Sequence, residues 1–118
     1  MDRRIFSLLS LINEQIEANW TVERMAGLLD ISVSHFHKLF RENVGSSPNR
    51  YLREMRLEKA RSLLETTCLQ IKQIRLVVGI PNESNFLRNF TKNYGQNPSN
   101  HRKSSERFNI IAKSSRIK

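Results

Sequence analysis

The sequence predicts an all-α fold of about seven helices, and three observations support this class. Apolar residues recur at helical spacing along most of the chain. No stretch alternates convincingly between apolar and polar residues, as a half-buried strand would. Finally, SHFHKLFRENVGSSPNRYLR (residues 34–53) is echoed by SNFLRNFTKNYGQNPSNHRK (residues 84–103), with Ser, Phe, Phe, Asn, Gly and Pro at a constant offset of 50 residues. The chain therefore repeats one helical unit.

Four helices are predicted in the first 66 residues. The first covers about residues 2–18, where five aliphatic side chains share one face: Ile5, Leu8, Leu9, Ile12 and Ile16. The second follows Thr21, a good N-cap residue. The third follows Ser32 and ends at Gly45, which readily adopts the left-handed conformation of a C-cap. The fourth begins at Pro48, a residue well suited to a first helical position, and ends near Thr66.

Three further helices are predicted after residue 66. Residues 69–81 repeat the second helix, Asn82 is placed to cap the next one, Gly95 ends it, and Asn97-Pro98 starts a last short helix. Residues 104–118 are expected to form a basic, flexible tail, anchored only by Phe108, Ile110 and Ile111. The expected divisions are thus 1–66, 67–103 and 104–118.

A short helix, a tight turn and a second helix with buried aromatic residues make up the plan of a helix-turn-helix. The two copies are Val22–Val44 and Ile71–Tyr94. Such a unit needs a small residue where its helices cross and a turn-permissive residue four positions later. The first copy has Ala26 and Asp30 there, but the second, whose turn is one residue longer, has Arg75 at the crossing and Gly79 in the turn. We expect the Arg75 guanidinium to extend into solvent, or the two helices to splay.

The fourth helix is expected to join the two units. Its 19 residues would span about 28 Å at 1.5 Å per residue, whereas successive major-groove faces of B-DNA lie about 34 Å apart. A helix of this length would allow the two units to enter adjacent major grooves. Because the copies follow one another along the chain and are not related by a two-fold axis, one monomer is expected to bind an asymmetric site.

GSSPNRYLREMRLEKARSLLETT and IKQIRLVVGIPNESNFLRNFTKNYGQNPSNHRK resemble the DNA-binding domain of the AraC/XylS family of bacterial transcription regulators, and the resemblance covers about residues 5–103. It implies seven helices, two helix-turn-helix units joined by a long helix, and promoter binding that recruits RNA polymerase. Members usually join this domain to a sensor domain, though some consist of little else. The chain departs from the family pattern at Arg75, Ile80 and His101, where the family prefers a small residue, Phe and Tyr.

Exposed side chains near the start of each recognition helix are the candidates for base contacts. The resemblance points to Ser34, His37 and Lys38 in the first copy. The matching positions in the second copy are Ser84, Leu87 and Arg88, with Asn85 beside them. Arg88 is suited to bidentate contact with guanine, Lys38 to donation to guanine, and Leu87 to packing on a thymine methyl group. The alternative is that these are solvated surface residues, with the two serines only filling or capping a first helical turn.

Further basic residues near the two recognition helices are expected to contact phosphates, which fixes register without reading sequence. They are Arg41, Arg50, Arg53, Lys92, Arg102 and Lys103. Backbone N–H groups at the starts of the recognition helices and near Pro48 and Pro98 are further candidates.

Composition favours a polyanionic partner and argues against several other classes. Twenty Lys and Arg against eleven Asp and Glu leave a formal charge of +9. No apolar run approaches the roughly 20 residues of a membrane span, and Cys68 is the only cysteine, which fits a reducing compartment. His35 and His37 are two residues apart and so point to different sides of a helix. We therefore expect no metal, no cofactor, no small-molecule pocket and no enzymatic activity.

The sequence favours a sequence-specific, double-stranded-DNA-binding transcription regulator, most simply an activator that contacts promoter DNA and RNA polymerase in the bacterial cytoplasm, at the nucleoid. Two alternatives remain open. One is a helical protein-interaction module with only non-specific DNA affinity, and the other is an amphipathic protein at a membrane surface. Basic residues on both recognition helices favour DNA as the partner. The first helix, which would lie on a membrane in the second alternative, has its Arg residues only at its start.

Overall fold

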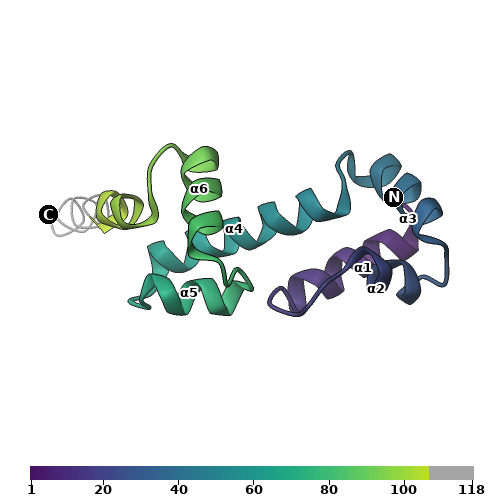
Figure 1. Cartoon of the computed structure of the whole chain (residues 1–118), viewed down its shortest axis with the longest axis horizontal. Coiled ribbons are helices and arrows are strands. Elements are labelled where there is room, and N and C mark those ends of the chain that lie inside the picture. Colours follow the sequence, from purple (N-terminus) through teal and green to yellow (C-terminus); the bar gives the residue numbers. More distant parts are fainter. Residues whose placement is uncertain (107–118) are drawn as a thin grey trace, which may run out of the picture. The chain divides into compact units, whose positions relative to one another are not determined.

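The computed structural model describes residues 1–106, which contain helices and no strand. The helices are α1 (Arg3–Glu14), α2 (Val22–Leu28), α3 (Val33–Val44), α4 (Pro48–Thr66), α5 (Ile71–Val78) and α6 (Glu83–Tyr94) (Figure 1). A seventh helical stretch, which we call the closing helix, covers residues 98–106. The all-α class with about seven helices is confirmed. Residues 104–106, which the sequence assigned to the tail, are helical, and the apolar tail residues Phe108, Ile110 and Ile111 lie outside the described residues.

The chain divides into two compact units, Met1–Arg56 and Leu57–Lys118, so the division falls within α4. A boundary after residue 66 would assign all of α4 to the first unit. The packing divides the helix instead, because Leu52 joins the first core and Leu57, Ala60 and Leu64 join the second. Each unit therefore has its own hydrophobic core and its own helix-turn-helix.

The core of the first unit forms where α1, α2 and α3 bury their apolar faces together with Leu52 of α4. Its innermost side chains include Ile5, Ile12, Met25, Phe36 and Phe40, all essentially inaccessible to solvent. Trp20 closes one side of this core: its indole Nε1 donates to the Gln15 carbonyl at 2.8 Å, and Arg24 lies 4.6 Å from the ring centroid. Ala26, the small residue expected at the crossing, is buried.

The first helix ends at Glu14, earlier than the predicted end near residue 18. Gln15 leaves the helical conformation, and its carbonyl accepts from the Ala18 amide and from the Trp20 indole. Ile16 remains buried, so its position in the predicted apolar stripe reports burial although it lies beyond the helix.

Arg56 fastens the loop after α1 to α4. Its guanidinium donates to the carbonyl groups of Ile16 at 2.9 Å and Ala18 at 2.8 Å. Burial lowers the pKa of Arg56 from its ordinary value, and the nearby Glu17 carboxylate partly opposes that shift. The pair of hydrogen bonds compensates this partly buried cation for lost hydration.

The predicted caps of both helix-turn-helix units are present. The side chains of Thr21, Ser32 and Asn82 accept from backbone amides three residues later. Gly45, Gly79 and Gly95 end their helices in the left-handed conformation. Asp30 adopts φ +56°, the non-glycine residue with positive φ among those described, in the turn for which the sequence selected it.

Over residues 1–106, the second core repeats the first with fewer buried side chains. Leu57, Ala60 and Leu64 of α4 pack with Ile74, Val78, Phe86 and Phe90 of α5 and α6. Phe90 makes edge-on contacts with Tyr94 at 4.7 Å and with His101 of the closing helix at 5.6 Å between ring centroids.

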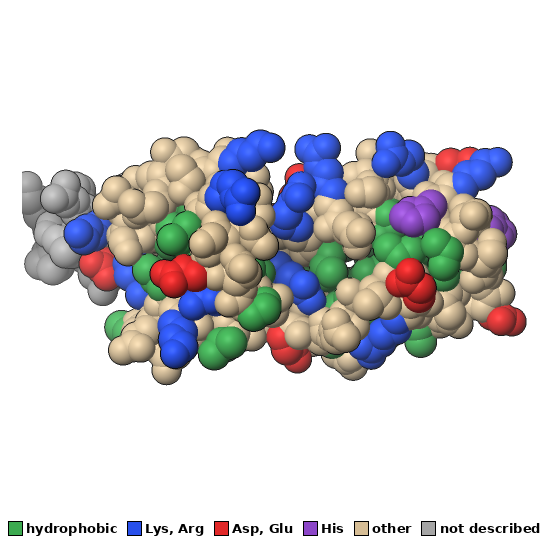
Figure 2. All heavy atoms as spheres, viewed as in Figure 1, with side chains coloured by type: hydrophobic (Ala, Val, Ile, Leu, Met, Phe, Trp, Pro, Cys, Tyr) green, Lys and Arg blue, Asp and Glu red, His purple; other side chains and the backbone are tan. Residues whose placement is uncertain are grey.

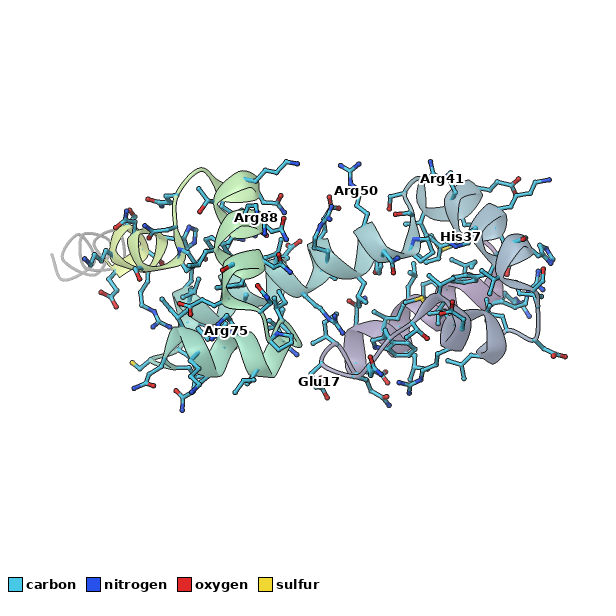
Figure 3. All side chains as sticks on the ribbon, viewed as in Figure 1. Glu17, His37, Arg41, Arg50, Arg75 and Arg88 are labelled. Carbon is cyan, nitrogen blue, oxygen red and sulfur yellow. The ribbon has the colours of Figure 1, made fainter. Side chains whose placement is uncertain are left out.

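Arg75 is the main departure from expectation in this unit. Arg75 is 9% exposed, so its guanidinium does not extend into solvent, the first of the two predicted outcomes. One guanidinium nitrogen, Nη1, donates to the carbonyl of Pro81, while Nε is buried without a hydrogen-bond partner. The second unit tolerates a large residue at the crossing because its longer turn brings a carbonyl to the guanidinium. Figure 3 shows Arg75 on α5.

The closing helix is attached to the end of α4 by two side chains. His101 Nε2 lies 2.7 Å from a Glu65 carboxylate oxygen. Arg102 donates to the carbonyl groups of Leu64 at 3.1 Å and Thr67 at 3.3 Å, which the end of an α-helix leaves without intrahelical partners. Cys68, in the segment that follows α4, is exposed.

Candidate nucleic-acid interface

The recognition helix of the first unit is α3. Phe36 and Phe40 are buried, and this orientation leaves Ser34, His37 and Lys38 exposed on the other face. All three predicted base-contact residues of this unit are therefore accessible to a partner. Figure 3 shows His37 on α3.

The recognition helix of the second unit is α6, and its four predicted base-contact residues, Ser84, Asn85, Leu87 and Arg88, are also exposed. Leu87 has 37% of its surface accessible. Arg88 Nη2 donates to Asn85 Oδ1 at 2.8 Å, and the Asn85 amide in turn donates to the cap residue Asn82, also at 2.8 Å. The guanidinium is thereby attached to the first turn of the helix, the part of a recognition helix that enters the groove.

Five of the six predicted phosphate-contact residues are exposed: Arg41, Arg50, Arg53, Lys92 and Lys103. Arg50 also pairs with Glu54 one helical turn later, at 3.1 Å, and its side chain keeps 63% of its accessible surface. Lys and Arg side chains are visible beside both α3 and α6 in Figure 2. These positions are compatible with phosphate contacts, which remain a prediction.

Arg102, the sixth, is half-buried and already donates to two carbonyl groups at the end of α4. A guanidinium has five N–H groups, yet these contacts hold the Arg102 side chain against its own unit. Of the predicted phosphate contacts, it is the one that its surroundings support least.

Each unit has an open hollow beside its recognition helix. The first hollow, of about 440 Å³, is lined by residues that include Thr21, Glu23, Val33, His37 and Asn49. The second hollow, of about 510 Å³, is lined by residues that include Lys72, Arg75, Glu83, Leu87, Asn97 and Ser99. The two are built alike: each meets the first turn of both helices of its helix-turn-helix and the first turn of the next helix.

Lys72 is the residue of this surface that sequence analysis missed. It is exposed in the first turn of α5 and lines the second hollow. The corresponding residue of the first unit is Glu23, in the first turn of α2. Comparing the two copies position by position, with attention to first helical turns as well as recognition helices, would have revealed this reversal of charge.

Two other features, a metal site and a membrane-spanning helix, are absent from the part of the chain that the structure describes. Within residues 1–106, no three His, Cys, Asp or Glu side chains gather closely enough to hold a metal ion. Over the same residues, none of the helices combines the length and apolar character needed to span a membrane.

Comparison with known proteins identifies the domain. A family model described as a helix-turn-helix domain, of the AraC type, matches residues 25–104, more than half of the chain. The chain belongs to the AraC/XylS family. The proteins of this family that it matches are transcription regulators, which agrees with the expectation that the chain is not an enzyme.

Curated AraC/XylS relatives match most of the chain. An uncharacterised HTH-type transcriptional regulator of Haemophilus influenzae is 34% identical over 103 residues, covering 87% of this chain and 35% of the relative. The lactose operon transcription activator of Staphylococcus xylosus is 36% identical, covering 80% of this chain and 34% of the relative. The chain thus spans about a third of the length of these relatives.

Solved structures agree with the fold. The C-terminal domain of the response regulator yesN from Fusobacterium nucleatum is 28% identical with a TM-score of 0.79, covering 86% of this chain and 99% of that one. The DNA-binding domain of AdpA, solved with a target DNA, has a TM-score of 0.83 at 22% identity, covering 87% of this chain and 93% of that one. This second likeness concerns the fold alone.

Proposed function

We propose that this chain is the sequence-specific, double-stranded-DNA-binding part of a transcription activator, and that α3 and α6 read different bases of one asymmetric promoter site. One observation carries the proposal. In both units the predicted base-contact residues are exposed on the face of the recognition helix opposite its buried phenylalanines.

The two reading faces differ in chemistry, which supports an asymmetric target. The first presents Ser34, His37 and Lys38, and the second presents Leu87 with an Arg88 that is held by Asn85. Arginine favours guanine through paired contacts to O6 and N7, whereas leucine favours the thymine methyl group. Two such different surfaces in one chain are unsuited to identical half-sites.

Binding to a randomised duplex library at two salt concentrations tests this proposal, with the wild type beside Lys38→Ala and Arg88→Ala. Lys59→Ala is a matched control, because Lys59 is an exposed lysine of α4 outside both reading faces. We expect an enriched motif with two parts about one helical turn apart, and each reading-face variant should relax a different part. A lost base contact typically costs about 1–3 kcal/mol of discrimination.

Two results would contradict the proposal. If no motif is enriched and affinity simply falls with salt, the chain is a helical interaction module with only electrostatic DNA affinity. If Lys38→Ala alone changes the motif, the second unit holds phosphates without reading bases.

Activation belongs to the same proposal. The Staphylococcus xylosus relative is named as an activator, and we propose that this chain likewise places RNA polymerase at a promoter, in the cytoplasm at the nucleoid. In vitro transcription from a promoter carrying the selected motif tests this. Transcription should rise with the wild type and stay at its basal level with Arg88→Ala, while a fall caused by the wild type would identify a repressor.

A further inference from the structure

We infer that the second hollow is a phosphate-binding site, and that the first hollow, although built alike, is not. The inference deepens the proposed function, since the phosphate would come from the DNA backbone beside the bases that α6 reads. It concerns Lys72 and Arg75, which the sequence does not associate with DNA.

Three helix N-termini meet at the second hollow. Lys72 lies in the first turn of α5, Glu83 is the first residue of α6, and Ser99 lies in the first turn of the closing helix, whose cap residue Asn97 also lines the hollow. Backbone N–H groups of a first turn lack intrahelical partners, and the helix dipole makes that end favourable to anions. Convergence of three such ends favours an anion more than one end does.

Arg75 provides the independent observation. It is buried, it lines the hollow, and its Nε has no hydrogen-bond partner while Nη1 is engaged by Pro81. A buried guanidinium without full compensation is costly, and a bound anion at the adjacent hollow would supply the missing opposite charge. Lys72 adds a second, exposed cation at the same hollow.

Glu83 is the acidic residue of this lining, so two cations face one carboxylate. Within residues 1–106, no ion pair joins Glu83 to Lys72 or Arg75. Among the described residues of their own unit, therefore, no carboxylate neutralises Lys72 or Arg75 through an ion pair.

The first hollow provides an internal comparison. Its walls are the same first helical turns, but Glu23 stands where the second hollow has Lys72, and Ala26 stands where it has Arg75. Of the residues that the structure describes, neither a Lys nor an Arg lines the first hollow. If the helix N-termini alone determined anion binding, both hollows would bind anions equally. The side-chain charges differ between the hollows, and we infer that they restrict anion binding to the second.

The location suits a phosphate of bound DNA. Leu87 lines the second hollow and is also a predicted base-contact residue, so the hollow borders the reading face of α6. A phosphate held there would fix the register of α6 without contributing sequence information.

The test uses the full chain and the variant Lys72→Glu. This change gives α5 the acidic first-turn residue that α2 already has in Glu23, and an acid at that position favours a helix. The fold is therefore expected to survive. Lys59→Glu, the same charge reversal on exposed α4, is the control.

In the first arm, inorganic phosphate is titrated against chloride at constant ionic strength while backbone amide resonances are followed by NMR. We expect saturable shifts at residues 71–73, 83–85 and 99–100, none at the corresponding residues of the first hollow, and loss of the shifts in Lys72→Glu. Equal shifts at both hollows, or shifts that persist in Lys72→Glu, would overturn the inference.

In the second arm, the affinity for a non-specific duplex is measured as a function of salt. If the phosphate comes from DNA, Lys72→Glu should reduce the slope of log K against log salt by about one or more beyond the control. Phosphate shifts with an unchanged slope would support a site for free phosphate and not for DNA. The absence of both the phosphate shifts and the change in slope would refute the site. This outcome is distinct from failure of the proposed function, which depends on an enriched base motif.

Discussion

Arg88 has its nearest polar partner within its own helix, and that contact bears on how well it can select a base. A guanidinium on an exposed helix samples many rotamers, and ordering it costs free energy when it binds. The 2.8 Å hydrogen bond to Asn85 restricts that sampling before DNA arrives. Asn85 thus acts as a positioning residue, in addition to any base contact of its own.

Asn85→Ala should weaken, without abolishing, the base preference that Arg88 confers. The net value of such a hydrogen bond is about 0.5–1.5 kcal/mol, so the discrimination at one position should fall several-fold. Selection from a randomised duplex library would measure it. His35→Ala, at the corresponding place in α3, is the control, because its side chain makes no described hydrogen bond to Lys38. An undiminished preference in Asn85→Ala would show that Arg88 needs no internal support.

Arg102 illustrates a basic residue that makes contacts within its own unit. Arg102→Ala removes two hydrogen bonds to the end of α4, and bonds to a charged donor are worth roughly 1.5–3 kcal/mol each when buried, less when half-exposed. We expect a loss of about 1–2 kcal/mol in the stability of the second unit with little change in the salt slope of DNA binding. Denaturant unfolding and salt-dependent binding check the two parts.

Lys103→Ala is the matched comparison, because Lys103 is the adjacent residue and is exposed. It should leave stability unchanged and reduce the salt slope by about one. Should Arg102→Ala reduce the slope as much as Lys103→Ala does, the phosphate role predicted from the sequence would stand for both.

At the scale of elements, the two helix-turn-helix units solve the same crossing with different residues. The first has Ala26 at the crossing and Asp30 with positive φ in its turn, and the second has Arg75 with Gly79 and a turn one residue longer. In both units, the backbone amide after the positive-φ residue donates to the backbone carbonyl of the crossing residue. Ile31 donates to Ala26 at 3.2 Å, and Ile80 donates to Arg75 at 2.8 Å. The backbone arrangement is therefore shared, and only the side chain that fills the crossing differs.

This difference predicts unequal responses to reciprocal substitutions. Arg75→Ala removes a buried cation with an unpartnered Nε next to an open hollow, so the free energy of unfolding should change by less than about 1 kcal/mol, the loss of packing and the relief of desolvation opposing one another. Ala26→Arg places a guanidinium where the shorter turn brings no carbonyl, and should destabilise by about 3 kcal/mol or more. Chemical denaturation of both variants makes the comparison. Similar costs would show that the turn does not decide which residue the crossing tolerates.

The helix boundaries that could be predicted from the sequence are those set by local signals. Thr21, Ser32, Pro48, Asn82 and the three turn glycines mark helix ends by short-range chemistry, and all lie where expected. The predicted end of α1, near residue 18, was wrong because the Trp20 indole takes up the Gln15 carbonyl. This contact joins residues five apart, and no local pattern reveals it.

The site shows the same division between local and long-range information. Exposure of Lys38 and Arg88 follows from the helical period once Phe36 and Phe86 are buried. The burial of Arg75 against Pro81 depends on how the turn closes, and the role of Arg102 depends on the distant end of α4. Neither contact can be read from residue spacing, because Arg75 meets Pro81, and Arg102 meets the end of α4, only when the chain folds.

For the whole molecule, the two separate cores raise the question of how far one unit's stability depends on the other's. Phe40 belongs to the first core and Phe90 to the second, and α4 contributes residues to both. Truncating either aromatic ring should cost about 3–5 kcal/mol locally. If coupling through α4 is weak, this loss should stay within one unit.

Phe90→Ala should therefore lower the unfolding midpoint of the helix signal in circular dichroism without lowering that of Trp20 fluorescence to the same extent. The chain has a single tryptophan, and it is buried in the first core, so its emission reports on that unit. Phe40→Ala is the converse and should move the fluorescence transition most. Coincident transitions in both variants would instead indicate a single cooperative unit.

Trp20 and Cys68 have a practical consequence for solution spectroscopy. The indole is the chain's only one and belongs to the first unit, and the thiol is the chain's only one, exposed, and belongs to the second. An acceptor dye attached to that thiol would pair with the native tryptophan as a donor for resonance energy transfer. The wild-type chain thus needs only one dye for a donor–acceptor pair that joins its two units. Energy transfer between Trp20 and the dye would report changes in the distance between the units as duplex is added.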